Sequence, residues 1–273
     1  MAVLERLCTS NGTVGSNPTP SATSIMKNPV EKIFELNKPF VYFHTHVIDQ
    51  PVLDWALAAG KSLEVDMSMD KNGQIFIGHP LIFYEFKKLP PPANLPFDQV
   101  IGQIKDSGLY LVLDCKDVRA LPRAQTIIQD LGSERCLMHA WADALLFKPY
   151  PKEIEIEPHW KFEDLPLAEI LRTKAATGVP LVISTRGLTL ARLEDEGDAI
   201  LDKIIKTASG KIDAVSLHLP AGEVAPMSVM QKLLDNGIMT LFNLDQVPAS
   251  ARPSVFIGST DFIEQASDPK DFR

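Results

Sequence analysis

The chain has 273 residues, a length that suits one large domain such as a barrel of roughly 250 residues. Its 35 acidic and 27 basic side chains give a formal net charge of −8, which excludes a global positive field that would attract nucleic acid. No apolar run of about twenty residues is present, so the sequence predicts no transmembrane segment. We therefore expect a soluble protein with a small-molecule partner. An anionic partner would require positively charged groups gathered at one site.

The three cysteines and the N-terminal stretch carry little structural information. Cys8, Cys115 and Cys136 are an odd number and lack the spacing of a zinc site or a disulfide framework, which favours a reducing, cytoplasmic location. The first 25 residues end in a stretch rich in Ser, Thr, Asn, Gly and Pro. We expect a disordered extension over residues 1–27, with Met26 as an alternative start, and a single domain over residues 28–273. The sequence does not indicate whether the protein is a monomer or an oligomer.

From residue 38 onward, short β-branched or aromatic runs alternate with longer helical stretches, which is typical of parallel β/α units. The runs predicted as strands are Val41 to His44, Leu63 to Asp66, Tyr110 to Asp114, Cys136 to His139, Leu181 to Ser184, Ala214 to His218, Met239 to Asn243 and Val255 to Gly258. The helices between them are predicted to begin near Pro51, Pro96, Ala124, Leu165, Ala191 and Met227. This alternation predicts an α/β fold, a (β/α)₈ TIM barrel. An open doubly wound sheet is disfavoured because no glycine-rich phosphate loop follows the first strand.

Three segments interrupt the repeat. Asp70-Lys71-Asn72-Gly73 predicts a hairpin turn, followed by a short segment from Gln74 to Gly78. The stretch from Leu89 to Pro96 contains four prolines and is predicted as a rigid excursion between the second and third strands. Tyr150 to Glu157 is predicted as an additional strand or a loop.

Charged residues gather at the carboxyl ends of the second and third predicted strands, where barrels place their reactive groups. Glu64 and Asp66 are two residues apart and point to the same face of their strand, while Val65 points to the helices. Asp114 and Lys116 repeat this arrangement on the next strand. Because adjacent strands lie about 4.8 Å apart, we expect these four charged groups to lie close together.

Three carboxylates and one ammonium group leave two uncompensated negative charges in a partly desolvated site. A divalent cation would neutralise them. Carboxylate ligands with room for water suit Mg²⁺, with Ca²⁺ or Mn²⁺ as further candidates. A network of ordinary salt bridges with one protonated acid is the alternative that the same residues allow.

Two histidines are predicted beside these acids. His44 ends the first strand, and the predicted turn folds His79 back over the barrel mouth, opposite His44. Imidazole has an ordinary pKa of about 6.5, so two such groups can divide the work of general acid and of base or nucleophile at neutral pH. We predict that His44 and His79 are the catalytic pair, with the division between them left open.

These residues resemble the signature of the glycerophosphodiester phosphodiesterase superfamily. The resemblance is strongest between Phe40 and Asp117, and its spacings are closer to those of the sphingomyelinase D and phospholipase D toxin relatives. It is carried by His44, Ala59 to Asp66, Asn72-Gly73, His79 and Leu113 to Lys116.

The resemblance implies a metal-dependent phosphodiesterase that cleaves a glycerophosphodiester or a lysophospholipid. It implies that Glu64, Asp66 and Asp114 hold the metal. It further implies that Lys116 contacts the phosphate and that His44 and His79 act as acid and base. The nucleophile is either water or an internal hydroxyl group of the substrate, so a cyclic phosphate is a conceivable product.

The chain departs from the family pattern at two places. Thr45 and His46 follow His44 where the glycerophosphodiester branch has arginine, and the Pro-Glu-Asn element of that branch is absent from the sequence. Phe242 stands where many relatives carry tryptophan on the seventh strand. We assign His46 and Phe242 to substrate binding, together with Lys116.

Two other interpretations use the same barrel. In the first, His44-Thr45-His46 binds zinc as in amidohydrolase-like barrels, with His139, His218 and Asp261 extending the site. In the second, the barrel has no catalytic activity and binds a phosphate head group or a protein partner.

Overall fold

The computed structural model describes residues 42–43, 47–147, 163–220, 223, 226–242, 256–257 and 259–260. Within these ranges, the side chains of residues 43, 227, 242, 256–257 and 259–260 are not described. The predicted extension over residues 1–27 and the predicted strand or loop from Tyr150 to Glu157 lie outside the described residues.

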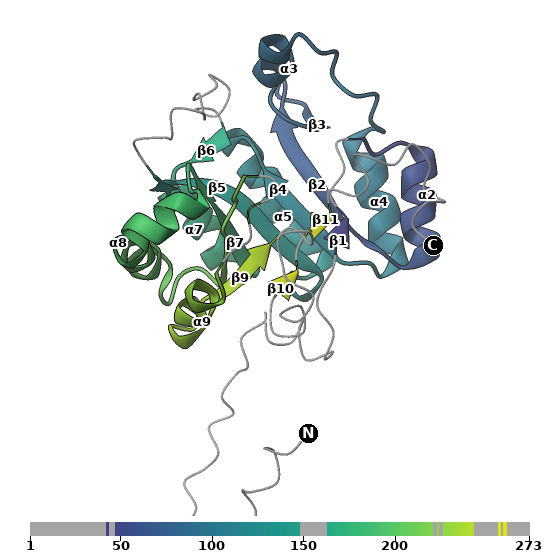
Figure 1. Cartoon of the computed structure of the whole chain (residues 1–273). Helices are drawn as coiled ribbons and strands as arrows, with labels where there is room; N and C mark the ends of the chain where they lie inside the picture. The colour runs from purple at the N-terminus through teal and green to yellow at the C-terminus, as the bar shows by residue number, and fades with distance from the viewer. Residues whose placement is uncertain are drawn as a thin grey trace, which may run out of the picture.

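A sheet of parallel strands forms the centre of the molecule (Figure 1). Its members are β1 (Tyr42–Phe43), β2 (Ser62–Met69), β4 (Leu111–Cys115), β5 (Cys136–Leu146), β7 (Leu181–Arg186), β8 (Ala214–Ser216), β9 (Met239–Phe242) and the pair β10 (Phe256–Ile257) and β11 (Ser259–Thr260). β10 pairs in parallel with β9, and β11 pairs in parallel with β1. β10 lies within the last predicted strand, Val255 to Gly258, and β11 begins just after that range, so these two short strands pair with the two ends of the sheet. The TIM barrel predicted from the sequence is confirmed.

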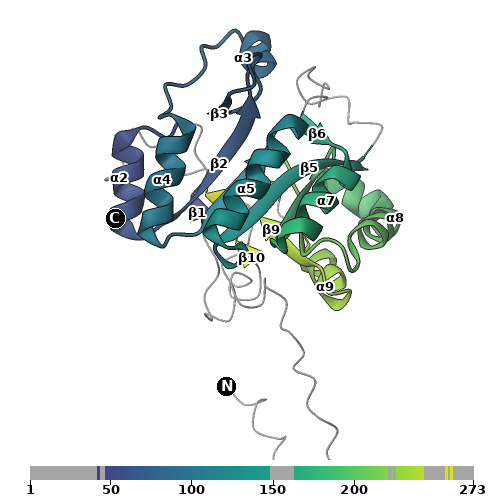
Figure 2. The same cartoon turned by 180° about the vertical axis from the view of Figure 1, so that it is seen from behind.

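The helices cover the outside of this barrel, as the view from behind shows for α4, α5 and α7 (Figure 2). The covering helices are α2 (Gln50–Ala59), α4 (Phe97–Ser107), α5 (Leu121–Leu131), α7 (Leu167–Thr177), α8 (Leu190–Ala208) and α9 (Met227–Asp235). All six covering helices begin within a few residues of their predicted starts. Two short 3₁₀ helices, η1 (Val118–Ala120) and η2 (Ser133–Arg135), flank α5.

Local sequence signals define the ends of α2. Its N-cap Asp49 accepts a hydrogen bond from the backbone N–H of Val52 at 3.0 Å, and Pro51 occupies the first turn. Gly60 ends the helix with a φ of 62°, a left-handed conformation that residues with a Cβ rarely adopt. Thr189 caps α8 in the same way as Asp49 caps α2.

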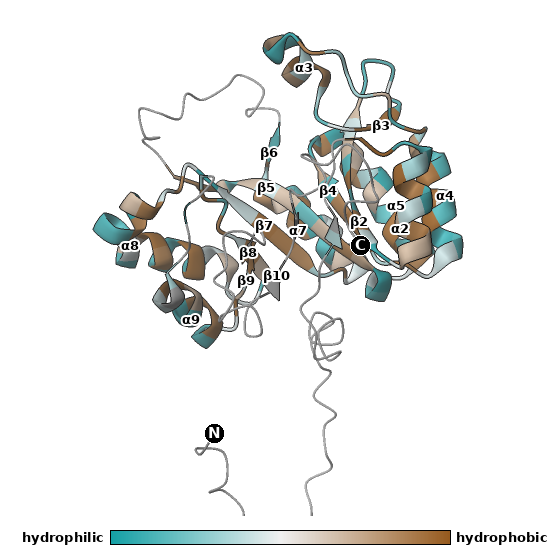
Figure 3. Ribbon diagram, turned by 45° about the vertical axis from the view of Figure 1, so that its right-hand side comes forward, coloured by the Kyte–Doolittle hydropathy of each residue, from teal (hydrophilic) through white to brown (hydrophobic). Residues whose placement is uncertain are grey.

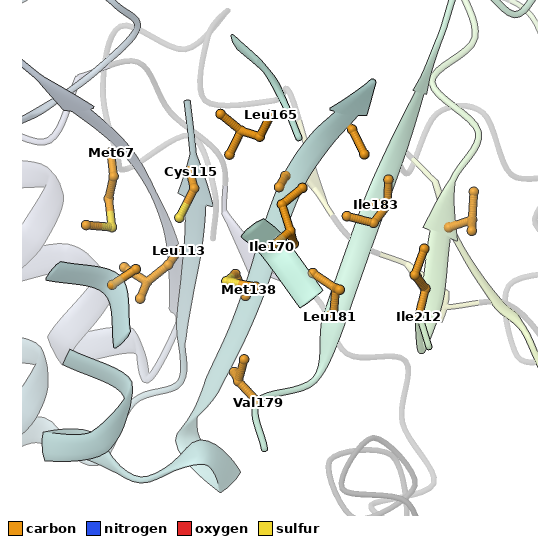
Figure 4. Packing of buried hydrophobic residues seen from close by; sticks show 14 of the residues in the cluster. Met67, Leu113, Cys115, Met138, Leu165, Ile170, Val179, Leu181, Ile183 and Ile212 are labelled. Atoms are coloured by element: carbon orange, nitrogen blue, oxygen red, sulfur yellow. The ribbon is translucent and has the colours of Figure 1, made fainter. Parts of the chain in front are cut away.

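Two apolar clusters stabilise the barrel. The larger lies between strands and helices, and Figure 3 shows hydrophobic colour along central strands such as β7. Figure 4 shows part of this cluster, including Met67, Leu113, Met138, Leu181 and Ile170. The smaller cluster fills one end of the barrel interior and consists of Tyr42, Val112, Leu137, Val182, Ala214 and Leu241. Strands buried on both faces explain why the sequence reads as continuous apolar runs rather than as alternating patterns.

An antiparallel hairpin extends from the carboxyl end of β2 and carries a short helix. β3 (Ile75–Ile77) pairs with β2, and Asp70 Oδ1 accepts hydrogen bonds from the backbone N–H groups of Asn72 and Gln74, both at 2.8 Å. This confirms the predicted turn. α3 (Leu81–Lys87) is not predicted from the sequence, because its seven mostly apolar residues show no helical period long enough to recognise.

Two further features go beyond the prediction. β5 continues to Leu146, well past its predicted end at His139, and β6 (Asp164–Leu165) pairs with it at Trp141 and Ala142.

Within the described ranges, none of the helices is both long and apolar enough to span a lipid bilayer.

Candidate functional site

The inward faces of three neighbouring strands change from apolar to polar toward their carboxyl ends. On β4, Val112 belongs to the interior apolar cluster, whereas Asp114 and Lys116 follow at alternate positions on the same face. The neighbouring strands repeat this change with Leu137, His139 and Trp141 on β5, and with Val182, Ser184 and Arg186 on β7. A buried polar layer therefore lies above the apolar layer, at the barrel end where active sites form.

Strand register brings the charged residues of this layer together. Asp66 on β2 is paired with Asp114 on β4, and Asp114 is paired with His139 on β5. Glu64 lies two residues before Asp66 and is also buried. The four charged groups predicted to converge, with Lys116 as the fourth, do lie together, and a histidine joins them.

Lys116 is a buried cation held by acids. Its Nζ lies 2.6 Å from Asp114 Oδ2 and 3.7 Å from Asp66 Oδ1. Burial opposes the charged form, but the surrounding carboxylates outweigh it and raise the pKa of Lys116 above its ordinary value. Burial would likewise raise the pKa of Asp114, yet the charges of Lys116 and His139 hold it well below its usual range. Both groups are therefore ionised at neutral pH.

Glu64, Asp114 and His139 form a candidate metal site, called the metal triad below. One potential ligand atom from each lies within 4.8 Å of the others, and all three residues are buried. His139 Nδ1 lies 3.2 Å from Asp114 Oδ2 and 3.5 Å from Glu64 Oε1. The sequence predicts Asp66, rather than His139, as the third ligand. Asp66 lies instead between Lys116 and His79, 3.7 Å from each.

The chemistry of the metal triad fits a divalent metal ion. Asp114 Oδ1 is buried, yet no residue in the described part of the chain donates a hydrogen bond to it. His139 Nε2 lies 2.6 Å from Ser184 Oγ, the kind of second contact that orients metal-binding imidazoles. Burial alone would lower the pKa of His139, but Asp114 and Glu64 raise it to about 9, so a proton occupies Nδ1 when no metal competes for that position.

His79 lies at the edge of the same layer, after β3. Its Nδ1 lies 2.7 Å from Glu163 Oε1, and its Nε2 lies 3.7 Å from Asp66 Oδ2. The ring stacks on Phe83 of α3, with ring centroids 4.4 Å apart. The backbone N–H of His79 donates to the Tyr84 hydroxyl at 3.1 Å. The hairpin and α3 thus present the imidazole to the acids, as the predicted turn requires.

Glu163 is a site residue that sequence reasoning misses. It is 3% exposed, lies just before β6 and approaches Arg186 Nη2 at 3.5 Å as well as His79. Burial alone would raise the pKa of Glu163, but the hydrogen bond from His79 and the charges of Lys116 and Arg186 hold it below its ordinary value. The chain offers no local signal for this role, because Glu163 and His79 are 84 positions apart.

Arg186 and Trp141 close one side of the polar layer. The Arg186 guanidinium lies 4.2 Å from the centroid of the Trp141 ring and 3.0 Å from Asp164 Oδ1. His218 is exposed and its ring makes a T-shaped contact with the ring of Trp141, with ring centroids 4.7 Å apart. Among the described residues, only the metal triad forms a group spaced for a metal. The zinc interpretation also uses His44, His46 and Asp261, which lie outside the described residues, so it stays a prediction.

Several predicted residues are not placed by the structure. His44 and His46 lie outside the described residues, as does Asp261. Phe242 ends β9, but its side chain is not described. The catalytic role of His44 and the substrate contacts of His46 and Phe242 therefore stay predictions.

No family model matches the chain, and no curated protein matches it. Among solved structures, the chain is similar to an HpcH/HpaI aldolase from Desulfitobacterium hafniense DCB-2, with a TM-score of 0.44 and 11% identity over 86% of this chain and 92% of that one. It is similar to a phosphonopyruvate hydrolase in complex with oxalate and Mg²⁺, with a TM-score of 0.44 and 10% identity over 86% and 81% of the two chains. It is also similar to orotidine 5'-monophosphate decarboxylase from Methanocaldococcus jannaschii, with a TM-score of 0.42 and 12% identity over 86% and 94%. The barrel assignment rests on the strand pairing described above.

The predicted relation to the glycerophosphodiester phosphodiesterase superfamily is wrong. No model of that family matches, and the similar solved structures are described as an aldolase, a hydrolase and a decarboxylase. The residues behind the resemblance are alternating acids at a strand end, a hairpin turn and a histidine. Barrels of many functions place polar groups at these same strand ends, so the pattern reflects the architecture and does not identify a family.

Proposed function

We propose that this barrel is a metal-dependent phosphodiesterase that acts on a small glycerophosphodiester or lysophospholipid-type substrate. The position of Asp66 carries the proposal: one of its oxygens lies 3.7 Å from Lys116 Nζ and the other 3.7 Å from His79 Nε2. A buried ammonium group and an imidazole nitrogen thus converge beside the metal triad. Phosphodiester cleavage needs these parts, namely positive charge for the nonbridging oxygens and a group that transfers protons.

The metal triad would hold the divalent ion, with the predicted ligand Asp66 beside it. Bound there, the ion would supply positive charge that polarises the phosphoryl oxygens. Two carboxylates and one imidazole nitrogen suit Mn²⁺ or Zn²⁺ as well as the predicted Mg²⁺, because nitrogen ligands favour the transition metals.

The chain's own residues account for the remaining chemistry. Lys116 binds a nonbridging phosphate oxygen and stays protonated because of its acidic neighbours. The incoming oxygen, from water or from a substrate hydroxyl, forms a bond to phosphorus while the ester P–O bond breaks. The incoming group loses a proton and the departing alkoxide gains one. His79 exchanges one of these protons at Nε2, and the predicted partner His44 exchanges the other.

Phosphorus NMR on a panel of glycerophosphodiesters and lysophospholipids tests this proposal. With Mg²⁺ or Mn²⁺ we expect a phosphomonoester or a cyclic phosphate to form, and with a chelator we expect none. His79→Ala should lose turnover while the far-ultraviolet circular dichroism spectrum is unchanged. Full activity in the presence of chelator would show that the reaction needs no metal. If no member of the panel gave a product, phosphodiester cleavage would be ruled out as the reaction.

A second candidate is a metal hydrolase that acts on a carboxylic ester or an amide. The observation that favours it is the imidazole nitrogen of His139 in the metal triad, since nitrogen ligation favours zinc. Metal analysis of the purified protein, together with the activity measured on the phosphodiester panel, separates the two candidate functions. Tightly bound zinc at one ion per chain, with an inert panel, would support the second.

A further inference from the structure

We infer that Glu163 is the positioning residue of His79, holding the imidazole with Nδ1 protonated and Nε2 turned toward Asp66. The inference rests on the proposed function for its catalytic meaning, but its geometry stands by itself. Glu163 lies on the segment that leads into β6, far in sequence from the hairpin that carries His79. The contact thus joins two elements that only the fold brings together.

The first support is the quality of the contact. Glu163 Oε1 lies 2.7 Å from His79 Nδ1, the length of a charge-assisted hydrogen bond, and Glu163 is 3% exposed. Carboxylates are almost never buried to this degree without a partner that uses their charge. His79 is a closer partner than Arg186, whose Nη2 lies 3.5 Å from the other oxygen of Glu163.

The second support is that Arg186 has a second acid, Asp164, beside it. Arg186 Nε lies 3.0 Å from Asp164 Oδ1, a closer approach than its 3.5 Å contact with Glu163. The guanidinium also stacks on Trp141. Arg186 Nη2 donates to one oxygen of Glu163 at 3.5 Å, while the shorter hydrogen bond of Glu163, at 2.7 Å, joins its other oxygen to the imidazole.

The third support is what an ionised carboxylate does to a neutral imidazole. A carboxylate only accepts hydrogen bonds, so the ring nitrogen beside it must carry the proton. With Nδ1 as the donor, the lone pair of neutral His79 resides on Nε2, whose distance of 3.7 Å from Asp66 Oδ2 is too long for a hydrogen bond that would hold a proton there. Stacking on Phe83 fixes the ring plane, and Glu163 fixes which nitrogen faces the polar layer. The uncharged amide of glutamine can either donate or accept and does not impose this choice.

Nitrogen-15 NMR of histidine-labelled protein tests the tautomer without any substrate. The chain has six histidines, so the spectrum is tractable, and His79→Gln assigns the His79 signals by their loss. In the wild-type protein, at a pH where the His79 ring is neutral, we expect a protonated Nδ1 and an unprotonated Nε2. In Glu163→Gln we expect a mixture of tautomers or the reverse one.

Steady-state kinetics with a phosphodiester that the wild-type protein cleaves give the second readout. We expect kcat to fall about 10- to 100-fold in Glu163→Gln with KM changed less than about twofold, because orientation of a catalytic group matters in the reaction rather than in binding. Glu163→Asp, which keeps the charge on a shorter side chain, should recover part of kcat. Glu169→Gln is the matched control, since Glu169 is a half-buried carboxylate of α7, outside the polar layer, that pairs with the exposed Arg172.

The outcomes separate this inference from the proposed function. A wild-type His79 with its neutral-state proton on Nε2 overturns the positioning role, as does a Glu163→Gln protein with unchanged tautomer and unchanged kcat. An inert wild-type protein with the expected tautomer overturns the phosphodiesterase proposal and leaves the positioning role standing. Equal losses in Glu163→Gln and Glu169→Gln would show a general effect of charge removal and overturn the specific role.

Discussion

Among single residues, Lys116 is the buried cation that contacts the acids of the polar layer on both β2 and β4. Its ammonium group contacts Asp114 at 2.6 Å and lies 3.7 Å from Asp66, with all three side chains buried. Removing one member of a buried ion pair leaves the other charge uncompensated, which costs more than the pair itself contributes.

We therefore predict that Lys116→Met lowers the free energy of unfolding of the metal-free protein by about 3–5 kcal/mol. Added divalent metal should restore part of the loss, because it supplies positive charge to the same carboxylates. Urea titration with and without metal measures both effects. Lys232→Met is the control, since Lys232 pairs with Asp198 at the surface and its loss should leave the midpoint unchanged. Equal stability of the two variants would contradict the electrostatic account.

A second residue-scale prediction concerns acid stability. The pKa of Glu163 lies below its ordinary value of 4.5, so the folded protein binds this proton less readily than the unfolded chain. Its contribution to stability is therefore complete above about pH 4.5 and is lost as the pH falls through the lower folded pKa. The difference in unfolding free energy between wild type and Glu163→Gln should shrink as the pH is lowered from about 6 toward the acid limit of folding. A difference that stays constant with pH would contradict this assignment.

At the scale of elements, the hairpin and α3 determine where His79 lies. Gly78 has a φ of 129°, and a Cβ at this position would lie 2.5 Å from the Tyr84 hydroxyl oxygen. That hydroxyl accepts the backbone N–H of His79. The close approach of β3 to α3 thus leaves no room for a side chain at residue 78.

We predict that Gly78→Ala lowers kcat by up to about 100-fold, because it shifts the imidazole without touching the metal triad. Metal binding, measured by calorimetry, should persist. Gly73→Ala is the matched control: it also has a positive φ, of 82°, but no atom lies within 4 Å of the position that a Cβ would take there. That control should lose some stability through backbone strain and keep its kcat. Loss of metal binding in Gly78→Ala would show that the two parts of the site are not separable.

The elements also show how far the sequence could be interpreted. The eight strands were predictable because each is a short, mostly apolar run, and the central strands β2, β4, β5 and β7 are buried on both faces. Glu64, Asp66, Asp114 and Lys116 followed from the two-residue repeat of a strand. His139 ends a predicted strand, but the sequence suggests it only as part of a zinc site. Glu163 depends on a contact across 84 positions, which no local pattern encodes. α3 escapes prediction because seven residues span barely two helical turns.

For the molecule as a whole, metal binding at the triad would be linked to global stability, because the members of the triad come from three neighbouring strands of the barrel, β2, β4 and β5. A ligand that binds only the folded state adds to the free energy of unfolding, by about 2.7 kcal/mol at a concentration of about 100 times its Kd. For a protein of this size, that amounts to a rise in Tm of roughly 5–10 °C.

We predict such a rise in Tm with saturating Mn²⁺ or Mg²⁺ and its reversal by a chelator, measured by differential scanning calorimetry. Glu64→Gln should abolish most of the metal-dependent rise, whereas Glu169→Gln, on α7 and outside the metal triad, should retain it. The same Tm with and without metal at saturating concentrations would rule out the metal triad as a binding site.

Barrel closure has a consequence for synthesis of the protein. β10 and β11 come after the seven other barrel strands in the chain, yet they pair with β9 and with β1 respectively. A nascent chain that has emerged from the ribosome only as far as β9 presents two unpaired strand edges, the surfaces on which polypeptides join one another. Until residues 256–260 emerge, a chaperone that shields exposed edges would be the factor that separates productive folding from aggregation.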